Sequence, residues 1–276
     1  MTKPETDRSE SELAQYPLGV NSSRRIAIVA VIGLSAGFLA GLFGVGGGIL
    51  IVPALVLFLG LDQRLAHGTS LAAIVPIAVV GVAGYASSGS VDWIAAAILA
   101  VGAALGAVVG THALQRLPER ALRVAFSVFL VATAISLFLD LGSSGAQKGL
   151  TLASAAGLVA IGLASGTIAG LLGVGGGIII VPAMVLLLSM PVAVAKGTSL
   201  AVIVPTAVVG TFRNLRTRNA DLALAVVVGV TGMASSYAGS RLSVTMDPRL
   251  SKVLFACLLI AVVGTLLFTG NGRRAN

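Results

Sequence analysis

Residues Gly41–Ala54 read GLFGVGGGILIVPA, and residues Gly170–Ala183 read GLLGVGGGIIIVPA. Twelve of these fourteen aligned positions are identical at an offset of 129 residues. The same offset aligns His67–Gly81, HGTSLAAIVPIAVVG, with Lys196–Gly210, KGTSLAVIVPTAVVG, and twelve of these fifteen positions are identical. A fixed offset over both stretches indicates that the chain contains two copies of one internal repeat.

The composition places both repeats in a lipid bilayer. Hydrophobic residues make up 57% of the 276 residues, charged residues only 10%, and the mean hydropathy is +1.02. An ordinary soluble domain carries about 25% charged residues. A soluble α/β protein would need short buried strands between polar turns, whereas the apolar runs here continue for about 20 residues, the length of a spanning helix. We therefore expect an all-α polytopic membrane protein.

The net charge of +8 does not indicate nucleic-acid binding. Basic residues lie near the ends of the apolar runs, where the positive-inside bias and anionic lipid head groups favour them. The single cysteine, Cys257, excludes an internal disulfide and a cysteine-based metal site. Because His67 and His112 are far apart in the sequence, we expect no metal, and nothing in the chain calls for a cofactor. No catalytic triad, carboxylate pair or nucleotide-binding motif is recognisable, so we do not expect an enzyme or an ATP-driven pump.

Each repeat contains five apolar stretches. We expect a disordered cytoplasmic tail over residues 1–25, a first membrane repeat over 26–141, a linker over 142–148, a second repeat over 149–270 and a C-terminal tail over 271–276. The expected segments are Arg25–Gly44, Gly47–Leu61, Gly68–Ser87, Asp92–Leu114 and Glu119–Leu141, then Gly149–Gly173, Gly176–Met190, Gly197–Arg213, Asp221–Leu242 and Arg249–Thr269.

The second segment of each repeat is too short to span the bilayer. About 14 residues cover roughly 20 Å, against a hydrocarbon core of about 30 Å. These segments must be tilted, re-entrant, or halves of a broken helix. Irregular backbone at membrane depth is tolerated only inside protein or beside a water-filled cavity. The glycine breaks at 44–48 and 173–177 should therefore face a cavity.

Loop charges favour inverted repeats. The loop after the third segment has no basic residue in the first repeat, whereas its counterpart in the second repeat contains Arg213, Arg216 and Arg218. If basic loops are cytoplasmic, equivalent loops lie on opposite sides of the membrane and the N-terminus is cytoplasmic. Arg241, Arg249 and Lys252 disagree, since they would then lie outside, and a parallel arrangement stays open.

The glycine runs are the first candidate site. Glycine permits positive φ and lets a ligand approach main-chain amides, and a helix that starts after such a run presents free amides and a partial positive charge. We expect an anion site at Gly46, Gly47 and Gly48 together with Gly175, Gly176 and Gly177. The alternative is that these glycines only permit close helix packing.

The Gly-Thr-Ser motifs are the second candidate. We expect Thr69, Ser70, Thr198 and Ser199 to lie at helix starts, where their hydroxyls either bind a ligand or cap the helix. His67 and Lys196 precede these motifs at equivalent positions, and a cation beside a helix start makes sense if an anion lies between them. Alternatively, both are solvated at the membrane surface. Four prolines inside apolar runs should bend their helices and serve as hinges: Pro53, Pro76, Pro182 and Pro205.

These motifs resemble the TauE/SafE sulfite-exporter family of bacterial and archaeal membrane transporters, over about residues 26–270. The resemblance implies secondary export of small sulfur-containing anions, such as sulfite, sulfoacetate or related organosulfonates, across the inner membrane. The partners implied are a small anionic substrate and the lipid bilayer, with no nucleic acid and with a homodimer left open. The alternatives are an ion channel, a carrier for another carboxylate or inorganic anion, and a structural membrane protein.

Overall fold

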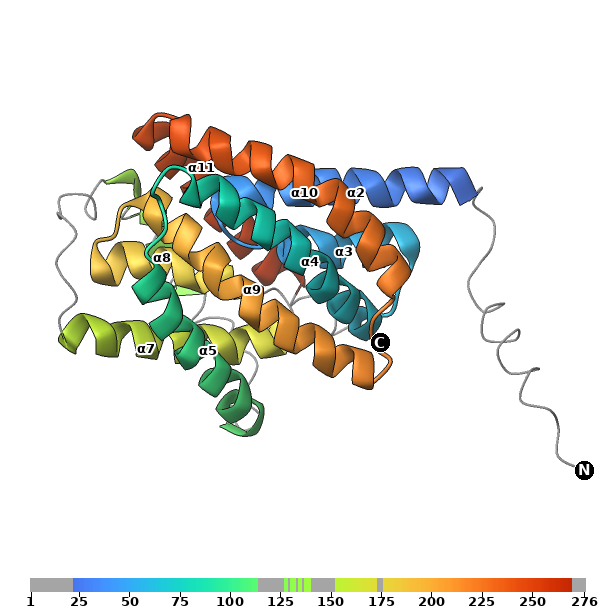
Figure 1. The fold of residues 1–276 in the computed structure, drawn as a ribbon, viewed down its shortest axis with the longest axis horizontal. Coiled ribbons are helices and arrows are strands. Elements are labelled where there is room, and N and C mark those ends of the chain that lie inside the picture. Colours follow the sequence, from blue (N-terminus) through green and yellow to red (C-terminus); the bar gives the residue numbers. More distant parts are fainter. Residues whose placement is uncertain are drawn as a thin grey trace, which may run out of the picture.

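The computed structural model describes residues 22–113, most of 127–139, 152–172 and 176–269. Wherever it describes the chain, regular structure is helical, as the sequence predicts (Figure 1). The helices are α2 (Ser22–Phe43), α3 (Gly48–Leu59), α4 (Gln63–Ala86), α5 (Trp93–Ala113), α7 (Leu152–Leu172), α8 (Gly177–Leu188), α9 (Val192–Arg216), α10 (Leu222–Thr245) and α11 (Pro248–Thr269).

Several expectations lie outside the described residues. They are residues 1–21 of the N-terminal tail, the linker over 142–148, the tail over 271–276 and most of the segment Glu119–Leu141. Residues 22–25, which we expected to belong to the tail, are instead the first turn of α2.

The long helices α4 and α9, which are equivalent in the two repeats, pack side by side and run in opposite directions. Gly68, near the start of α4, lies against the carbonyl oxygen of Asn219, just past the end of α9. Gly197, near the start of α9, lies against the carbonyl oxygen of Ser90, just past the end of α4. Ser90 and Asn219 are equivalent at the offset of 129 residues, so the contact is reciprocal. Any β-carbon at either glycine would overlap the opposing carbonyl.

The first helix of each half packs against the fourth helix of the other half. α2 lies parallel to α10, and α7 lies parallel to α5. Small residues at these interfaces let the backbones approach closely. The contacts, each between a glycine and a carbonyl oxygen, are Gly33–Val228, Gly37–Gly232, Gly162–Leu99 and Gly166–Ala103.

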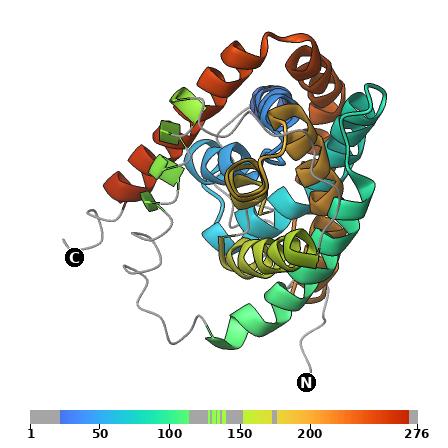
Figure 2. The same cartoon turned by 90° about the vertical axis from the view of Figure 1, so that its left-hand side faces the viewer.

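The short helices α3 and α8 lie among the longer ones, as a view along the long axis shows (Figure 2). Each has 12 residues, as short as the sequence predicts. In Figure 1, α3 lies to the right of the middle and α8 to the left. Both end at a residue in the left-handed conformation, Gly60 with φ 68° and Ser189 with φ 53°, at equivalent positions.

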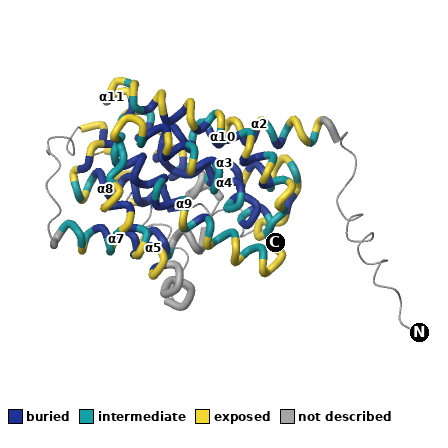
Figure 3. The backbone as a smooth tube through the Cα atoms, viewed as in Figure 1, coloured by how far each residue is buried: buried dark blue, intermediate teal, exposed yellow. Residues whose placement is uncertain are grey.

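The buried residues lie between the helices, and exposed residues lie on their outer sides (Figure 3). Many of these exposed residues are large and apolar. Leu57, Trp93, Phe212 and Val226 are each at least 59% exposed. Among the described helices, four are long and apolar enough to cross a membrane, namely α2 from Arg24, α4, α9 and α10. Large apolar side chains spread over such helices fit a lipid environment, and the chain is a multi-pass membrane protein.

Two helix starts differ from the expectation. α4 begins at Gln63 and α9 at Val192, each five residues before the predicted starts at Gly68 and Gly197. The Asp62 side chain accepts a hydrogen bond from the Arg64 amide at 3.0 Å and caps α4. The Gly-Thr-Ser motifs therefore lie in the second turn of each helix rather than at its end.

Candidate functional site

Each short helix begins at a glycine in the left-handed backbone region. Gly47 has φ 77° and ψ −12°, and Gly176 has φ 74° and ψ −13°. L-residues with side chains are strained in this conformation, so both positions favour glycine. No side chain caps either helix. The outermost amides of the first turn therefore lack an acceptor within their own helix.

The two breaks are in direct contact. A β-carbon at Gly177, the first residue of α8, would lie 2.8 Å from the Cα atom of Val45 and 3.0 Å from the carbonyl oxygen of Gly44. The side chain of Ile203 borders both breaks, because its Cδ1 atom would lie 3.1 Å from a β-carbon at Gly46 and 2.8 Å from one at Gly177. Residues 44–48 and Gly176 are buried, while the predicted Gly175 lies outside the described residues.

The electrostatics of this contact favour an anion. A helix start carries about half an elementary positive charge, and Ile203 lies against both Gly46, just before α3, and Gly177, the first residue of α8. Neither helix has an acidic residue in its first turn. No carboxylate in either first turn offsets this positive charge, and a bound anion would be stabilised by it.

Ser70 and Ser199 lie on the helix faces that border the breaks. Each precedes by one turn an isoleucine that contacts them, Ile74 on α4 and Ile203 on α9, and residues four apart share a helix face. Both serines are fully buried, and neither hydroxyl has a hydrogen-bond partner in the described part of the chain. Such groups are costly to bury unpaired, so they indicate a place for a polar ligand or water.

Thr69 and Thr198 do not cap their own helices, so the alternative that their hydroxyls act as helix caps is wrong. The Thr69 hydroxyl accepts a hydrogen bond from the Asp221 amide at 2.9 Å, and the Thr198 hydroxyl accepts one from the Asp92 amide at 2.9 Å. Each threonine thus holds the start of the fourth helix of the other repeat. Asp92 and Asp221 are themselves N-caps, since their side chains accept hydrogen bonds from the amides of Ala95 and Leu224, three residues further along the chain.

Lys196 is buried, so the alternative that it is solvated at the membrane surface is wrong. Its side chain is 1% exposed, and its ammonium nitrogen, Nζ, donates to the hydroxyls of Ser243 at 3.1 Å and Ser251 at 2.8 Å. Its counterpart His67 is half-buried, with its Nδ1 atom buried and without a partner among the described residues. Lys196 is thus fully buried, whereas His67 remains partly exposed.

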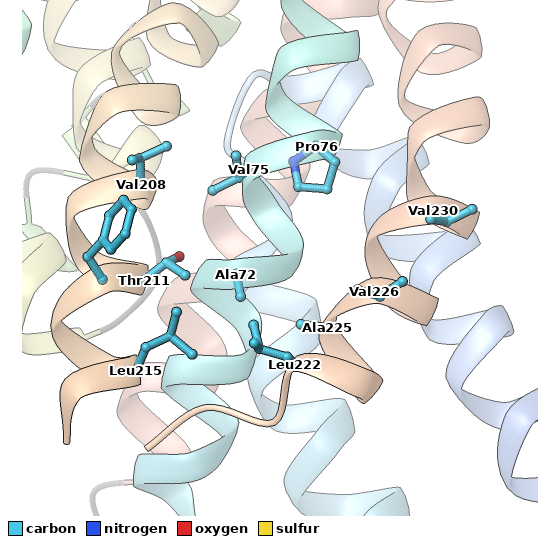
Figure 4. A pocket seen from close by; sticks show the side chains of 11 residues that line it. Ala72, Val75, Pro76, Val208, Thr211, Leu215, Leu222, Ala225, Val226 and Val230 are labelled. Carbon is cyan, nitrogen blue, oxygen red and sulfur yellow. The ribbon is translucent and has the colours of Figure 1, made fainter. Parts of the chain in front are cut away.

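All four prolines lie inside helices, as predicted: Pro53 in α3, Pro76 in α4, Pro182 in α8 and Pro205 in α9. A pocket of about 330 Å³ adjoins Pro76, between α4, α9 and α10 (Figure 4). Its wall is apolar except for Thr211, whose hydroxyl donates to the Ala207 carbonyl at 2.7 Å. Such a surface suits lipid chains and offers nothing to an anion.

Tyr85 makes a polar contact between two helices that the sequence analysis does not predict. It is fully buried on α4, and its hydroxyl donates to the carbonyl oxygen of Gly41 at 2.8 Å, near the end of α2. A tyrosine within an apolar run is itself a signal, because a buried phenol hydroxyl requires a partner. The sequence alone could not identify that partner 44 residues away.

Comparison with known proteins agrees with this architecture. The model of the family described as "Sulfite exporter TauE/SafE" matches residues 6–137 and 158–276. The chain belongs to the TauE/SafE family. No solved structure matches it.

Relatives within the TauE/SafE family are named as transporters. "Probable membrane transporter protein YunE" of Bacillus subtilis is 30% identical over 263 residues, covering 84% of this chain and 96% of that protein. "Probable membrane transporter protein MJ0441" of Methanocaldococcus jannaschii is 24% identical over 254 residues, covering 85% and 92%. A "Probable membrane transporter protein" of Xylella fastidiosa is 27% identical over 231 residues, covering 82% and 88%. This TauE/SafE chain is thus a member of a family of membrane transporters.

Proposed function

We propose that the protein is a secondary transporter that exports small anions, such as sulfite, sulfoacetate or other organosulfonates, across the inner membrane. One observation carries the proposal: the uncapped starts of α3 and α8 both border Ile203, and neither has a carboxylate in its first turn. Half-helices whose starts point at an anionic group near the middle of the bilayer are a recurring feature of secondary transporters. The family description supports the sulfur-containing class of substrate.

Main-chain amides of the breaks would supply most of the donors. Residues 46–48 and 175–177 offer amides without a side chain in the way, and Ser70 and Ser199 add hydroxyls from the flanking helices. Trigonal and tetrahedral oxyanions accept several such hydrogen bonds at once. The threonines Thr69 and Thr198 accept bonds from backbone amides, which leaves each hydroxyl hydrogen for a ligand.

Inverted repeats would let the same site open to either side. The opposite courses of α4 and α9 support this arrangement, in which the N-terminus and the basic loop at Arg216 are cytoplasmic. Bending at the four helix prolines would supply hinges. Because the cytoplasm is negative, moving one negative charge outward releases about 2.3 kcal/mol per 100 mV, which supports export against a concentration gradient of about fiftyfold.

Binding to the purified protein tests the site. We expect sulfite, sulfate or sulfoacetate to raise the melting temperature by mass action, and calorimetry to give a Kd that rises at least tenfold in Gly47→Ala and Gly176→Ala. Gly60→Ala is the matched control, since Gly60 also has a positive φ but nothing within 4 Å of its β-position. Loss of stability without loss of affinity in the two break variants would show that these glycines are structural only.

Transport assays separate an exporter from an ion channel with the same architecture. In proteoliposomes an exporter shows counterflow, in which unlabelled anion on one side drives labelled anion uptake from the other. A channel instead shows conductance that does not saturate with anion concentration. Conductance without counterflow would replace the proposed exporter with a channel.

A further inference from the structure

Lys196 carries a buried ammonium group among neutral partners. Its Nζ atom donates to the hydroxyls of Ser243 and Ser251 and lies 5.5 Å from the centre of the Phe43 ring and 5.7 Å from that of Phe255. Ring faces attract cations, but neither rings nor hydroxyls carry a negative charge. In the described residues no carboxylate lies within ion-pair distance of this nitrogen, although a buried charge is ordinarily paired.

The backbone of Lys196 is adjacent to the contact between the breaks. A β-carbon at Gly44 would lie 2.6 Å from the Cα atom of Lys196, and the carbonyl oxygen of Gly44 in turn faces Gly177, at the start of α8. Phe43, which lies under the ammonium, is the residue that leads into the first break. Gly44 thus lies between Lys196 and the start of α8 and contacts both.

The buried ammonium of Lys196 has no equivalent in the other half of the molecule. At the offset of 129 residues, the counterpart of Lys196 is His67, and leucines replace three of the four residues around its ammonium. These leucines are Leu114 for Ser243, Leu122 for Ser251 and Leu172 for Phe43, while Phe126 matches Phe255. The hydroxyls that hold the ammonium therefore have no counterpart in the other half.

We propose that Lys196 is the residue that makes the site prefer doubly charged anions over singly charged ones. The inference rests on the proposed anion site at the breaks. A fixed positive charge attracts an anion in proportion to the anion's charge, so a dianion gains about twice as much from Lys196 as a monoanion of the same shape. The helix starts and hydroxyls bind both kinds of anion, and Lys196 sets the ratio between them.

Sulfate and methanesulfonate form the test pair, because both are tetrahedral at sulfur and similar in size but carry charges of −2 and −1. We expect the wild-type protein to bind sulfate more tightly by calorimetry, and Lys196→Met to lower the preference for sulfate about tenfold. Removal of an uncompensated buried charge should not lower the melting temperature. Lys196→Gln serves as a second variant that keeps a hydrogen-bond donor but removes the charge.

Two controls separate charge from packing. Ser243→Ala combined with Ser251→Ala removes the hydroxyls but keeps the ammonium, and should keep the preference for sulfate. Lys252→Met removes a neighbouring positive charge from α11 and should also keep it. An unchanged preference in both Lys196 variants, or an equal loss of affinity for both anions, would overturn this inference. If the wild-type protein binds neither anion, the proposed function itself fails.

Discussion

Lys196 and His67 occupy equivalent positions in the two repeats, yet their surroundings differ. The Lys196 ammonium is enclosed by two hydroxyls and two rings that belong to three other helices, α2, α10 and α11. His67 is half-buried, and its Nδ1 atom has no partner in the described chain. The backbone around the two residues is nevertheless alike, since the glycine that follows each of them meets the corresponding carbonyl of the other repeat.

The two repeats therefore share some features and differ in others. Glycine contacts and threonine hydrogen bonds recur in both halves, and they hold the halves together. The side chains at Lys196 and Ser243 occur in one half only, and they make the two approaches to the breaks chemically unequal. Under the proposed function, we expect the choice of anion to depend on these unequal residues rather than on the features that the repeats share.

Membrane topology distinguishes inverted repeats from parallel ones. In a Cys257→Ala background we expect a cysteine at Ser88, after α4, to react with an impermeant reagent from outside. A cysteine at Thr217, after α9, should react only from the cytoplasmic side. Because α4 and α9 run in opposite directions, the two equivalent loops should lie on opposite sides. Labelling of both from the same side would exclude inverted repeats.

Gly68→Ala and Gly197→Ala should have the largest effects on stability. Each added methyl group would meet a carbonyl oxygen of the other repeat, and forced overpacking costs about 3 kcal/mol or more where backbone cannot yield. We expect a marked fall in melting temperature in detergent, of similar size in both variants. Gly264→Ala, with nothing within 4 Å, should be neutral or stabilising. A mild effect in one variant alone would show that the reciprocal contact is unequal.

Thr69→Val and Thr198→Val should each lower the free energy of unfolding by about 1–3 kcal/mol, because a backbone amide of the other repeat loses its acceptor. The two hydrogen bonds have equal lengths of 2.9 Å, so similar losses are expected in thermal unfolding. Thr206→Val is the control, since its hydroxyl bonds only to carbonyls of its own helix. If the two threonine variants matched that control, the cross-repeat bonds would contribute nothing.

The smallest changes in stability are expected at the ends of the short helices, where Ser189 and Gly60 are equivalent. Ser189 has a positive φ where the first repeat has Gly60. Ser189→Gly should raise the free energy of unfolding by up to about 1 kcal/mol, and Gly60→Ser should lower it by about as much, because a side chain is disfavoured in this conformation. Opposite shifts in melting temperature are expected, and shifts of the same sign would contradict this account.

Much of the fold could be predicted from local patterns. Apolar runs with glycine breaks predicted helices, their short second members and the positions of the breaks. The start of α4 before Gly68 was missed because residues 63–67, QRLAH, include polar side chains that resemble a loop rather than a membrane segment. Asp62, one residue past the predicted segment Gly47–Leu61, is the N-cap of that helix.

The candidate site was predicted less completely, because its contacts join distant parts of the chain. The glycines were identified from their repetition alone. The partners of Lys196 are 47 and 55 residues away, and those of the two threonines are 106 and 152 residues away. No spacing rule for a single helix covers such distances, so burial of the lysine and the role of the threonines required the folded arrangement.

The exchange of first and fourth helices between the halves also governs assembly during synthesis. Gly33 on α2 rests against Val228 on α10, which follows it by about 195 residues. At about 5–20 residues per second, the ribosome needs about 10–40 s to make that length of chain. During that interval the glycine face of α2 lies in the bilayer without its partner, and neither half can reach its final packing until the fourth helix of the second half has been inserted.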